Sequence, residues 1–461
     1  MGDIIESFVN NIVGTKFEDI PSREVEANKR NILDTMGAII AGSSEKGISE
    51  LVDLIKQWDG RKEATIWIYG GKVPAHQAAL VTGAMARNRE LESVHTKSGG
   101  NHVSATVLPA SFAMAEYVGG ISGKDFITAV ALGEDIVCRL GLAHKYPITV
   151  TGRIQMTRIL GPAAACAKIL GLDREKTYNA LGIAYSGGLT SIDMQQTVDG
   201  AMTSFLHYGF CAEGAVKATL LAKKGFTGTR NILQGKYGYF NVVEPDHDLS
   251  ELTRDLGKRF EGSYASTKPY ACCKCCHMSI NTILDLVNEY NIKAEDVKEI
   301  EIGVGQADYS MSIEPPERYD PPNVVSSRFS IPYCVATAVV NKKITLGDFT
   351  EEALSRPQVR ELMKKIKGKI EPEFANAGVQ SPATAKVRTK GNREYVKRRD
   401  TLRGEPETPM TMEEIAEEKF RWCLPFAAKP IPGKNAEDAI RLVSNLESVD
   451  DITKIIRLLA P

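Results

Sequence analysis

The chain has 461 residues, a length that suggests about two to three domains. Its 57 basic and 58 acidic residues leave a net charge of -1, which argues against a nucleic-acid-binding protein, since such proteins usually carry a basic excess. No apolar run reaches about 18 residues, and Met1 to Glu6 lack the basic and apolar regions of a secretory signal, so we expect a cytoplasmic protein without a membrane span.

The first 260 residues predict a succession of helices. Ser22 is a suitable N-cap, because its hydroxyl can accept a hydrogen bond from a free amide of the first turn. Several segments, such as 161–167, are rich in Ala and Gly, and small residues let buried helices pack closely. A short strand is expected at 64–69. The expected helices span residues 22–41, 48–58, 73–88, 104–118, 122–141, 159–171, 173–186, 204–224 and 248–258.

The sequence pattern changes near Phe260. Residues 297–304 alternate as in a strand, and a turn at Gly391-Asn392 between two short polar-apolar segments predicts a hairpin over 385–397. This order predicts a mainly α fold, with a large all-helical domain, a smaller α+β domain over about 262–402, and a helical C-terminus. Further helices are expected at 276–290, 327–341, 348–354 and 357–367, and after Thr411.

A polar, glycine-rich loop between two expected helices is the first candidate site. It holds Glu92, His95, Thr96 and His102, and it leads into a helix at Ser104. Free backbone amides at that helix start would attract a carboxylate, and His102 could act as an acid or a base near neutral pH. A solvated loop with Ser104 as the helix cap explains the same residues equally well.

Nine cysteines are present, and four of them form a cluster before His277, at Cys272, Cys273, Cys275 and Cys276. An odd number in a long chain does not indicate a disulfide framework, so reduced thiols are expected. Two overlapping Cys-x-x-Cys pairs are compatible with zinc, but the sequence offers no convincing second ligand pair. A crowded turn before a helix is the simpler interpretation.

Three isolated residues are weaker candidates. Lys268 precedes a proline and could be a desolvated base or a carboxylate anchor, although a surface lysine is the plain alternative. His207 stands on an apolar helix, where a satisfied core histidine is more common. Tyr309 follows an expected strand and could reach a pocket or pack at the strand edge. Gly303 and Gly305 do not complete a dinucleotide loop, so we reject a nucleotide site.

Six segments together resemble the MmgE/PrpD family almost from end to end, and their order and spacing carry the resemblance. The segment 102–110 departs slightly from the family signature His-Pro-x-x-x-x-Leu-Pro, because Val103 stands in place of the first proline. The segments are 34–42, 102–110, 221–228, 268–270 with His277, 328–333 and 403–409.

The resemblance implies cofactor-free chemistry, without a metal, on a small di- or tricarboxylate. It implies a catalytic set in which His102 is general acid or base, Lys268 holds a carboxylate or acts as the opposing base, and Tyr309 donates to a negative oxygen. Thr96 and Glu92 also occupy family site positions. Glu92 stands where decarboxylase-like members have Asp. The carboxylate is therefore kept, but on a side chain that is one methylene longer.

Two departures from the family concern the same site. The family's second site histidine is absent from residues 151–155, and Ser204 replaces a lysine. Arg153 is a candidate to supply the missing positive charge. With Glu92, Thr96 and the amides near Ser104, we therefore predict Arg153 and Ser204 as substrate-binding positions.

The resemblance also implies an arrangement of the domains. A helical domain of residues 1–261, completed by 403–461, should carry a smaller α+β lid of residues 262–402, with the site between the two parts. The family is typically dimeric, so we expect a homodimer. The expected ligand is a small polycarboxylate substrate.

The predicted function is that of a lyase, with dehydration as in 2-methylcitrate dehydratase placed ahead of decarboxylation as in cis-aconitate decarboxylase. An isomerase or epimerase of a small dicarboxylate is the alternative, because the two departures remove an acid or base and a cation. A carboxylate-binding relative without activity and a metalloprotein that uses 272–277 remain as further hypotheses.

Overall fold

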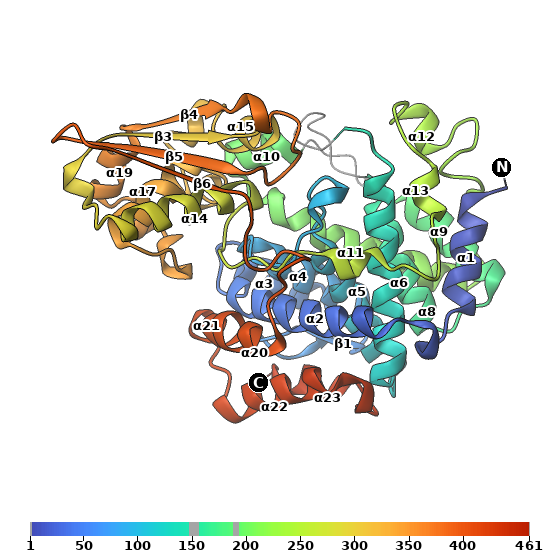
Figure 1. Ribbon diagram of the computed structural model, residues 1–461. Helices are drawn as coiled ribbons and strands as arrows, with labels where there is room; N and C mark the ends of the chain where they lie inside the picture. Colours follow the sequence, from blue (N-terminus) through green and yellow to red (C-terminus); the bar gives the residue numbers. More distant parts are fainter. Residues whose placement is uncertain (1, 147–155, 188–192, 461) are drawn as a thin grey trace.

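Helices form most of the chain up to residue 253 in the computed structural model, which describes residues 2–146, 156–187 and 193–460 (Figure 1). A small antiparallel hairpin of β1 (Ala64–Thr65) and β2 (Lys72–Val73) interrupts them. The helices are α1 (Ile4–Gly14), α2 (Ser22–Gly42), α3 (Ile48–Trp58), α4 (Ala75–Asn88), α5 (Val103–Val118), α6 (Gly123–Leu142), α8 (Leu160–Ile169), α9 (Arg174–Ser186), α10 (Asp193–Asp199), α11 (Thr203–Lys223), α12 (Tyr239–Val242) and α13 (Ser250–Thr253).

Helix α5 lies at the centre of this helical part. Every residue from Val103 to Ala115 is buried, and α4, α6, α8 and α11 all pack against the helix. Helix α8 is also buried along nearly its whole length, as its small residues predicted. The small side chains let neighbouring helix backbones approach one another, so the core is assembled largely from helix-to-helix contact.

The crossing of α4 and α11 depends on two glycines. A Cβ atom on Gly209 would lie 2.3 Å from the carbonyl oxygen of Leu80, and one on Gly83 would lie 2.9 Å from Cα of Gly209. Neither contact is sterically possible, so both positions require glycine. The close crossing places Arg87, one turn beyond Gly83, against the ring of Tyr208, with 5.1 Å between the guanidinium carbon and the ring centre.

A four-stranded mixed sheet forms the second part of the fold, in the order β4-β3-β5-β6. Strand β3 pairs in parallel with β4 and antiparallel with β5, and β5 and β6 form the expected hairpin. Helix α14 packs against β5 and β6, and α17 packs against α14 (Figure 1). The elements are β3 (Val297–Val304), β4 (Ile366–Ile370), β5 (Ala383–Thr389), β6 (Glu394–Arg399), α14 (Lys274–Glu289), α15 (Gln306–Ser312), α16 (Val324–Ser327), α17 (Ile331–Asn341), α18 (Glu351–Leu354) and α19 (Pro357–Met363).

The C-terminal helices lie beside α2, on the side away from the sheet (Figure 1). They are α20 (Met412–Ile415), α21 (Arg421–Cys423), α22 (Gly433–Ser444) and α23 (Thr453–Leu458). Buried Lys419 joins them to α2, because it forms an ion pair with Asp34. The predicted mainly α fold with a smaller α+β part is confirmed, whereas the boundaries 1–261 with 403–461 and 262–402 stay a prediction.

Several local predictions were wrong. Ser22 is the first residue of α2 and Pro21 precedes it as the N-cap without a side-chain hydrogen bond. The strand expected at 64–69 ends at Thr65, because the chain turns and Ile68 adopts a left-handed φ of 68°. The helix expected at 357–367 ends at Met363, and Ile366 begins β4.

The helices within the described ranges include none with the length and apolarity needed to cross a bilayer.

Candidate active site

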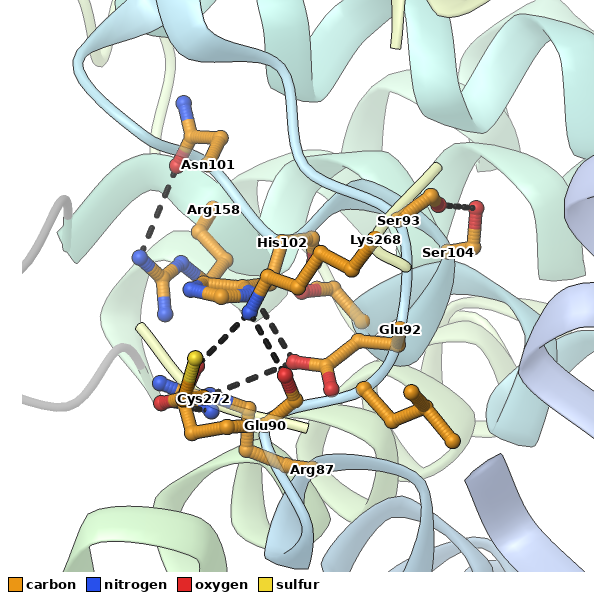
Figure 2. Close-up of polar contacts among 12 residues, drawn as sticks. Arg87, Glu90, Glu92, Ser93, Asn101, His102, Ser104, Arg158, Lys268 and Cys272 are labelled. Carbon is orange, nitrogen blue, oxygen red and sulfur yellow. Dashed lines mark hydrogen bonds and ion pairs between the residues drawn. The ribbon is translucent and has the colours of Figure 1, made fainter. Parts of the chain in front are cut away.

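The loop that joins α4 to α5 is tied to the segment before α14. Val94 and Ser266 exchange backbone hydrogen bonds of 3.0 and 2.7 Å, and the loop folds back on itself where His95 pairs with Asn101. This bridge brings Lys268 beside the carboxylates of the loop, although the two segments are far apart in the sequence (Figure 2). The loop and the lysine therefore form one cluster.

His102 lies against Glu92 in this cluster. Nδ1 of His102 is 2.7 Å from Oε1 of Glu92, although the contact is poorly aligned for a strong hydrogen bond. Nε of Arg87 lies 3.5 Å from the same oxygen. Burial, followed by the charges of Arg87 and Lys268, holds the pKa of His102 well below its usual value. His102 is therefore a neutral imidazole at neutral pH.

Lys268 is fully buried and directs its ammonium group at Glu90. Nζ lies 2.9 Å from the carbonyl oxygen of Glu90 and 2.8 Å from its Oε2, and Arg87 pairs with the other carboxylate oxygen. Burial lowers the pKa of Lys268, but Glu90 and Glu92 raise it more, so that the pKa lies above its usual value. Lys268 is therefore a cation whose charge Glu90 already offsets.

Glu90, Glu92 and His102 are also the only group of three metal-ligating side chains that converges in the described part of the chain. The arrangement does not fit a metal ion well. Arg87 and Lys268 already pair with these carboxylates, and a divalent cation would have to displace them or sit beside two positive charges.

The cysteine cluster lies at the start of α14, where all its thiols are buried. Nε2 of His277 lies 3.2 Å from the carbonyl oxygen of Cys272, and it must donate there because a carbonyl only accepts. No three of these groups converge as metal ligands in the ranges that the structure describes, so the geometry supports a packed turn.

An inner cavity opens between the helical part and the start of α14, with a volume of about 50 Å³. Positive groups dominate the wall, because Arg87, Arg158 and Lys274 all line it beside His102. Nζ of Lys274 pairs with Glu405 at 2.6 Å, and burial lowers the pKa of this lysine despite the nearby carboxylate. The other lining residues are Val94, Gly99, Gly100, Asn101, Thr197, Tyr208, Cys273, Cys275, Met311, Phe329 and Val379.

A larger outer cavity of about 420 Å³ adjoins the inner one. Gly99 and Val379 line both, so the two spaces meet along the glycine-rich loop. Thr96 lines the outer cavity together with Lys97 and Lys145. A small polyanion that reaches the inner cavity by way of the outer one meets cations in both, beside Glu405 in the outer cavity.

The structure does not bring every predicted site residue to a cavity. Ser104 is fully buried and donates to Glu134 at 2.5 Å, beside Ser93. Ser204 is buried in the first turn of α11, and Tyr309 packs half-buried on α15. Neither lines the inner or the outer cavity. Arg153 lies outside the described residues.

Sequence reasoning missed several groups that the structure places at the site. Arg87, Glu90 and Arg158 belong to no motif, and only the charged end of α4, after an apolar helix, offered a signal. Lys274 and Tyr208 lie within segments considered for Cys272 to His277 and for His207, but neither was predicted as a site residue. Their importance follows from burial and from contacts between distant segments, which a single sequence does not encode at any fixed spacing.

Two family models match the sequence. The MmgE/PrpD N-terminal domain matches residues 6–252, and the MmgE/PrpD C-terminal domain matches residues 270–447. The chain is similar to cis-aconitate decarboxylases of three organisms. It is 27% identical to the Homo sapiens protein over 474 residues, which cover 99% of this chain and 94% of that protein. It is 26% identical to the Mus musculus protein, with 99% and 93% coverage, and 26% identical to the Aspergillus terreus protein, with 96% and 93% coverage.

Proposed function

Because the chain belongs to the MmgE/PrpD family, we propose that it is a lyase that acts on a small di- or tricarboxylate at a carbon next to a carboxylate. The observation that carries the proposal is the contact of Glu92 with His102, which lines a cavity together with Arg87, Arg158 and Lys274. A proton-transfer group beside buried cations is what such a reaction requires, because charge develops on the substrate's oxygen atoms.

The contact with Glu92 gives the two nitrogens of His102 different tasks. A neutral imidazole carries one proton, and a lone pair 2.7 Å from a carboxylate oxygen would be repelled, so the proton belongs on Nδ1. Nε2 is then the nitrogen that exchanges a proton with the substrate. Glu92 fixes this tautomer and stabilises the imidazolium that forms when Nε2 takes up a proton, as carboxylates do for other catalytic histidines.

The buried ion pairs hold this arrangement in place. Arg87 contacts both Glu90 and Glu92, and Lys268 holds Glu90 by its carbonyl and its carboxylate. We therefore assign Lys268 a positioning role on the loop, in place of the direct substrate contact that the sequence suggested. Thr96 and Tyr309 stay predicted substrate contacts, Thr96 with the support of its place on the outer cavity.

Decarboxylation is the favoured reaction. The sequence alone placed dehydration first, but similarity to cis-aconitate decarboxylases over nearly the whole chain favours loss of CO2. The bond between the substrate carbon and one carboxylate breaks, CO2 leaves, and the electron pair stays on the remaining carbon skeleton. Nε2 of His102 carries no proton in the resting imidazole, so it first takes one up from solvent. The imidazolium, stabilised by Glu92, then delivers this proton to form the new C–H bond and returns to the neutral state.

Epimerisation is the second candidate, and one observation favours it. Ser204, which stands where the family has a lysine, is buried and carries no charge that could offset an additional carboxylate. A dicarboxylate needs one cation fewer than a tricarboxylate does. His102 would then remove and return a proton at one carbon with no loss of mass.

Product analysis tests the proposal. The purified protein is incubated with cis-aconitate and with a panel of citrate-like and aspartate-like acids, and CO2 and the organic products are measured. We expect CO2 from cis-aconitate, and we expect it to fall at least 100-fold in His102→Ala. Lys367→Ala, at an exposed lysine of β4, is the matched control and should keep full activity. A dehydrated product or an inverted centre without CO2 would replace decarboxylation with one of the other reactions.

A further inference from the structure

Arg158 is buried at the inner cavity without a carboxylate partner in the described part of the chain. Its residue is 4% exposed, and it lies on η3 (Met156–Ile159), a single turn of 3-10 helix before α8. NH2 lies 3.5 Å from Oδ1 of Asn101 (Figure 2). NH1 lies 3.5 Å from Nε2 of His207, while Nε has no hydrogen-bond partner. The guanidinium carbon lies 4.7 Å from the centre of the Tyr208 ring.

None of these contacts offsets the charge. Nδ1 of His207 lies 3.1 Å from the carbonyl oxygen of Thr203 and must donate to it, so Nε2 carries the lone pair that faces Arg158. Burial, followed by the charge of Arg158, holds the pKa of His207 well below its usual value, so the imidazole is neutral. His207, Asn101 and Tyr208 therefore orient the guanidinium, but they leave a buried positive charge.

Unlike Arg158, each neighbouring cation of the cluster pairs with a carboxylate. Arg87 pairs with Glu90 and Glu92, Lys268 pairs with Glu90, and Lys274 pairs with Glu405. A buried charge without a counterion is costly, and proteins keep such charges mainly where a ligand supplies the counterion. A guanidinium has five N–H donors in a planar fork that matches a carboxylate, and Arg158 uses at most two on described residues.

We propose that Arg158 is the carboxylate-binding residue of the inner cavity, and that it supplies the positive charge lost where Ser204 stands in place of a lysine. The carboxylate of a small polycarboxylate is the ligand. Arg158 and His102 both lie against the ring of Tyr208, at 4.7 Å and, between ring centres, 5.9 Å. A carboxylate on Arg158 therefore places the adjacent carbon on the side of the cavity where His102 acts. The identity of the ligand rests on the proposed function, whereas the anion site does not.

Binding of a non-reacting probe tests this inference apart from catalysis. The probe is tricarballylate, the saturated analogue of cis-aconitate, and its dissociation constant is measured by titration calorimetry with the full-length protein. We expect Arg158→Met to weaken binding by about 10–100-fold, the range for loss of a charge-assisted hydrogen-bonding pair. Arg174→Met, at an exposed arginine of α9 that pairs with Glu6, is the matched control and should bind as the unchanged protein does.

The melting temperature without ligand separates binding from a structural role. Arg158→Met should melt no lower than the unchanged protein, because it removes a buried charge that none of the described residues offsets. Loss of a structural arginine would lower the melting temperature. Should Arg158→Met fail to fold, Arg158→Lys carries the test. Lysine keeps the charge but lacks the planar fork, and we expect it to weaken binding several-fold at an unchanged melting temperature.

The outcomes distinguish this inference from the proposed function. Unchanged affinity in the Arg158 variants, or no binding of tricarballylate by the unchanged protein, overturns the inference even if cis-aconitate is decarboxylated. Binding that depends on Arg158 in a protein that releases no CO2 from cis-aconitate upholds the carboxylate site and contradicts the proposed function.

Discussion

Nδ1 of His102 lies 2.7 Å from Oε1 of Glu92, and both side chains come from the loop that joins α4 to α5. The pair is held from the other side, because Arg87 reaches the same oxygen of Glu92 and Lys268 fixes the loop through Glu90. Because Nδ1 of His102 faces a carboxylate, only Nε2 is available to exchange a proton with a substrate.

Glu92→Gln should lower the turnover number about 10–100-fold, with a smaller effect on KM. An amide can also present its N–H to Nδ1, so that the proton no longer belongs on that nitrogen, and it stabilises an imidazolium less than a carboxylate does. Steady-state rates of CO2 release from cis-aconitate measure the effect. Glu92→Asp, which keeps the carboxylate, is the control and should retain more activity. Equal rates in Gln and Asp variants would remove Glu92 from the mechanism.

Lys268→Met should destabilise the protein by about 3 kcal/mol in urea unfolding. It leaves the buried Glu90 carboxylate with Arg87 alone, and breaking a buried pair from one side is costly. Replacing both partners, in Lys268→Met with Glu90→Leu, should restore part of the loss. The exposed pair of Lys367 and Glu299 provides the control, since Lys367→Met should cost less than about 1 kcal/mol. Equal effects at the two lysines would mean that Lys268 does not anchor the loop.

How far the sequence predicted the fold depends on how local each signal is. The helix at 48–58 and the strand at 297–304 were predicted to the residue, because their periodicity and their flanking turns lie in adjacent sequence. Strand β4 was missed because it has only five residues and its apolar and polar residues alternate weakly. It is defined by its pairing with β3. His102 was found because it lies in a motif, whereas Arg158 was not, because its importance arises from Tyr208 and His207 on another helix.

Gly209→Ala should destabilise the protein by about 1–3 kcal/mol and lower the activity. The added Cβ would lie 2.3 Å from the carbonyl oxygen of Leu80, so α4 and α11 must move apart and shift Arg87 relative to Tyr208. Melting temperature and turnover number are measured together. Gly14→Ala, at the exposed end of α1 with no atom within 4 Å of the new Cβ, is the control and should be neutral or stabilising. A neutral Gly209→Ala would contradict the close crossing.

Glu134→Gln should make stability less dependent on pH. Burial raises the pKa of Glu134 to about 7, so between about pH 4.5 and pH 7 the folded state holds a proton that the unfolded state has lost. Stability therefore falls as the pH rises through this range, by on the order of 3 kcal/mol in total. Urea unfolding at pH 5 and pH 8 should show a gain for Glu134→Gln that is larger at pH 8. The exposed Glu407→Gln should show no such difference, and a pH-independent gain at Glu134 would contradict its raised pKa.

In the proposed reaction, His102 delivers a proton to a substrate carbon from which CO2 has left. The reaction of cis-aconitate in heavy water tests this role, with NMR and mass analysis of the product for the unchanged protein and for His102→Asn. We predict that each CO2 released is matched by one deuterium bound to carbon, and that both fall at least 100-fold together in the variant. Substrate that exchanges its C–H protons without releasing CO2, or a His102→Asn protein as active as the unchanged one, would contradict the account.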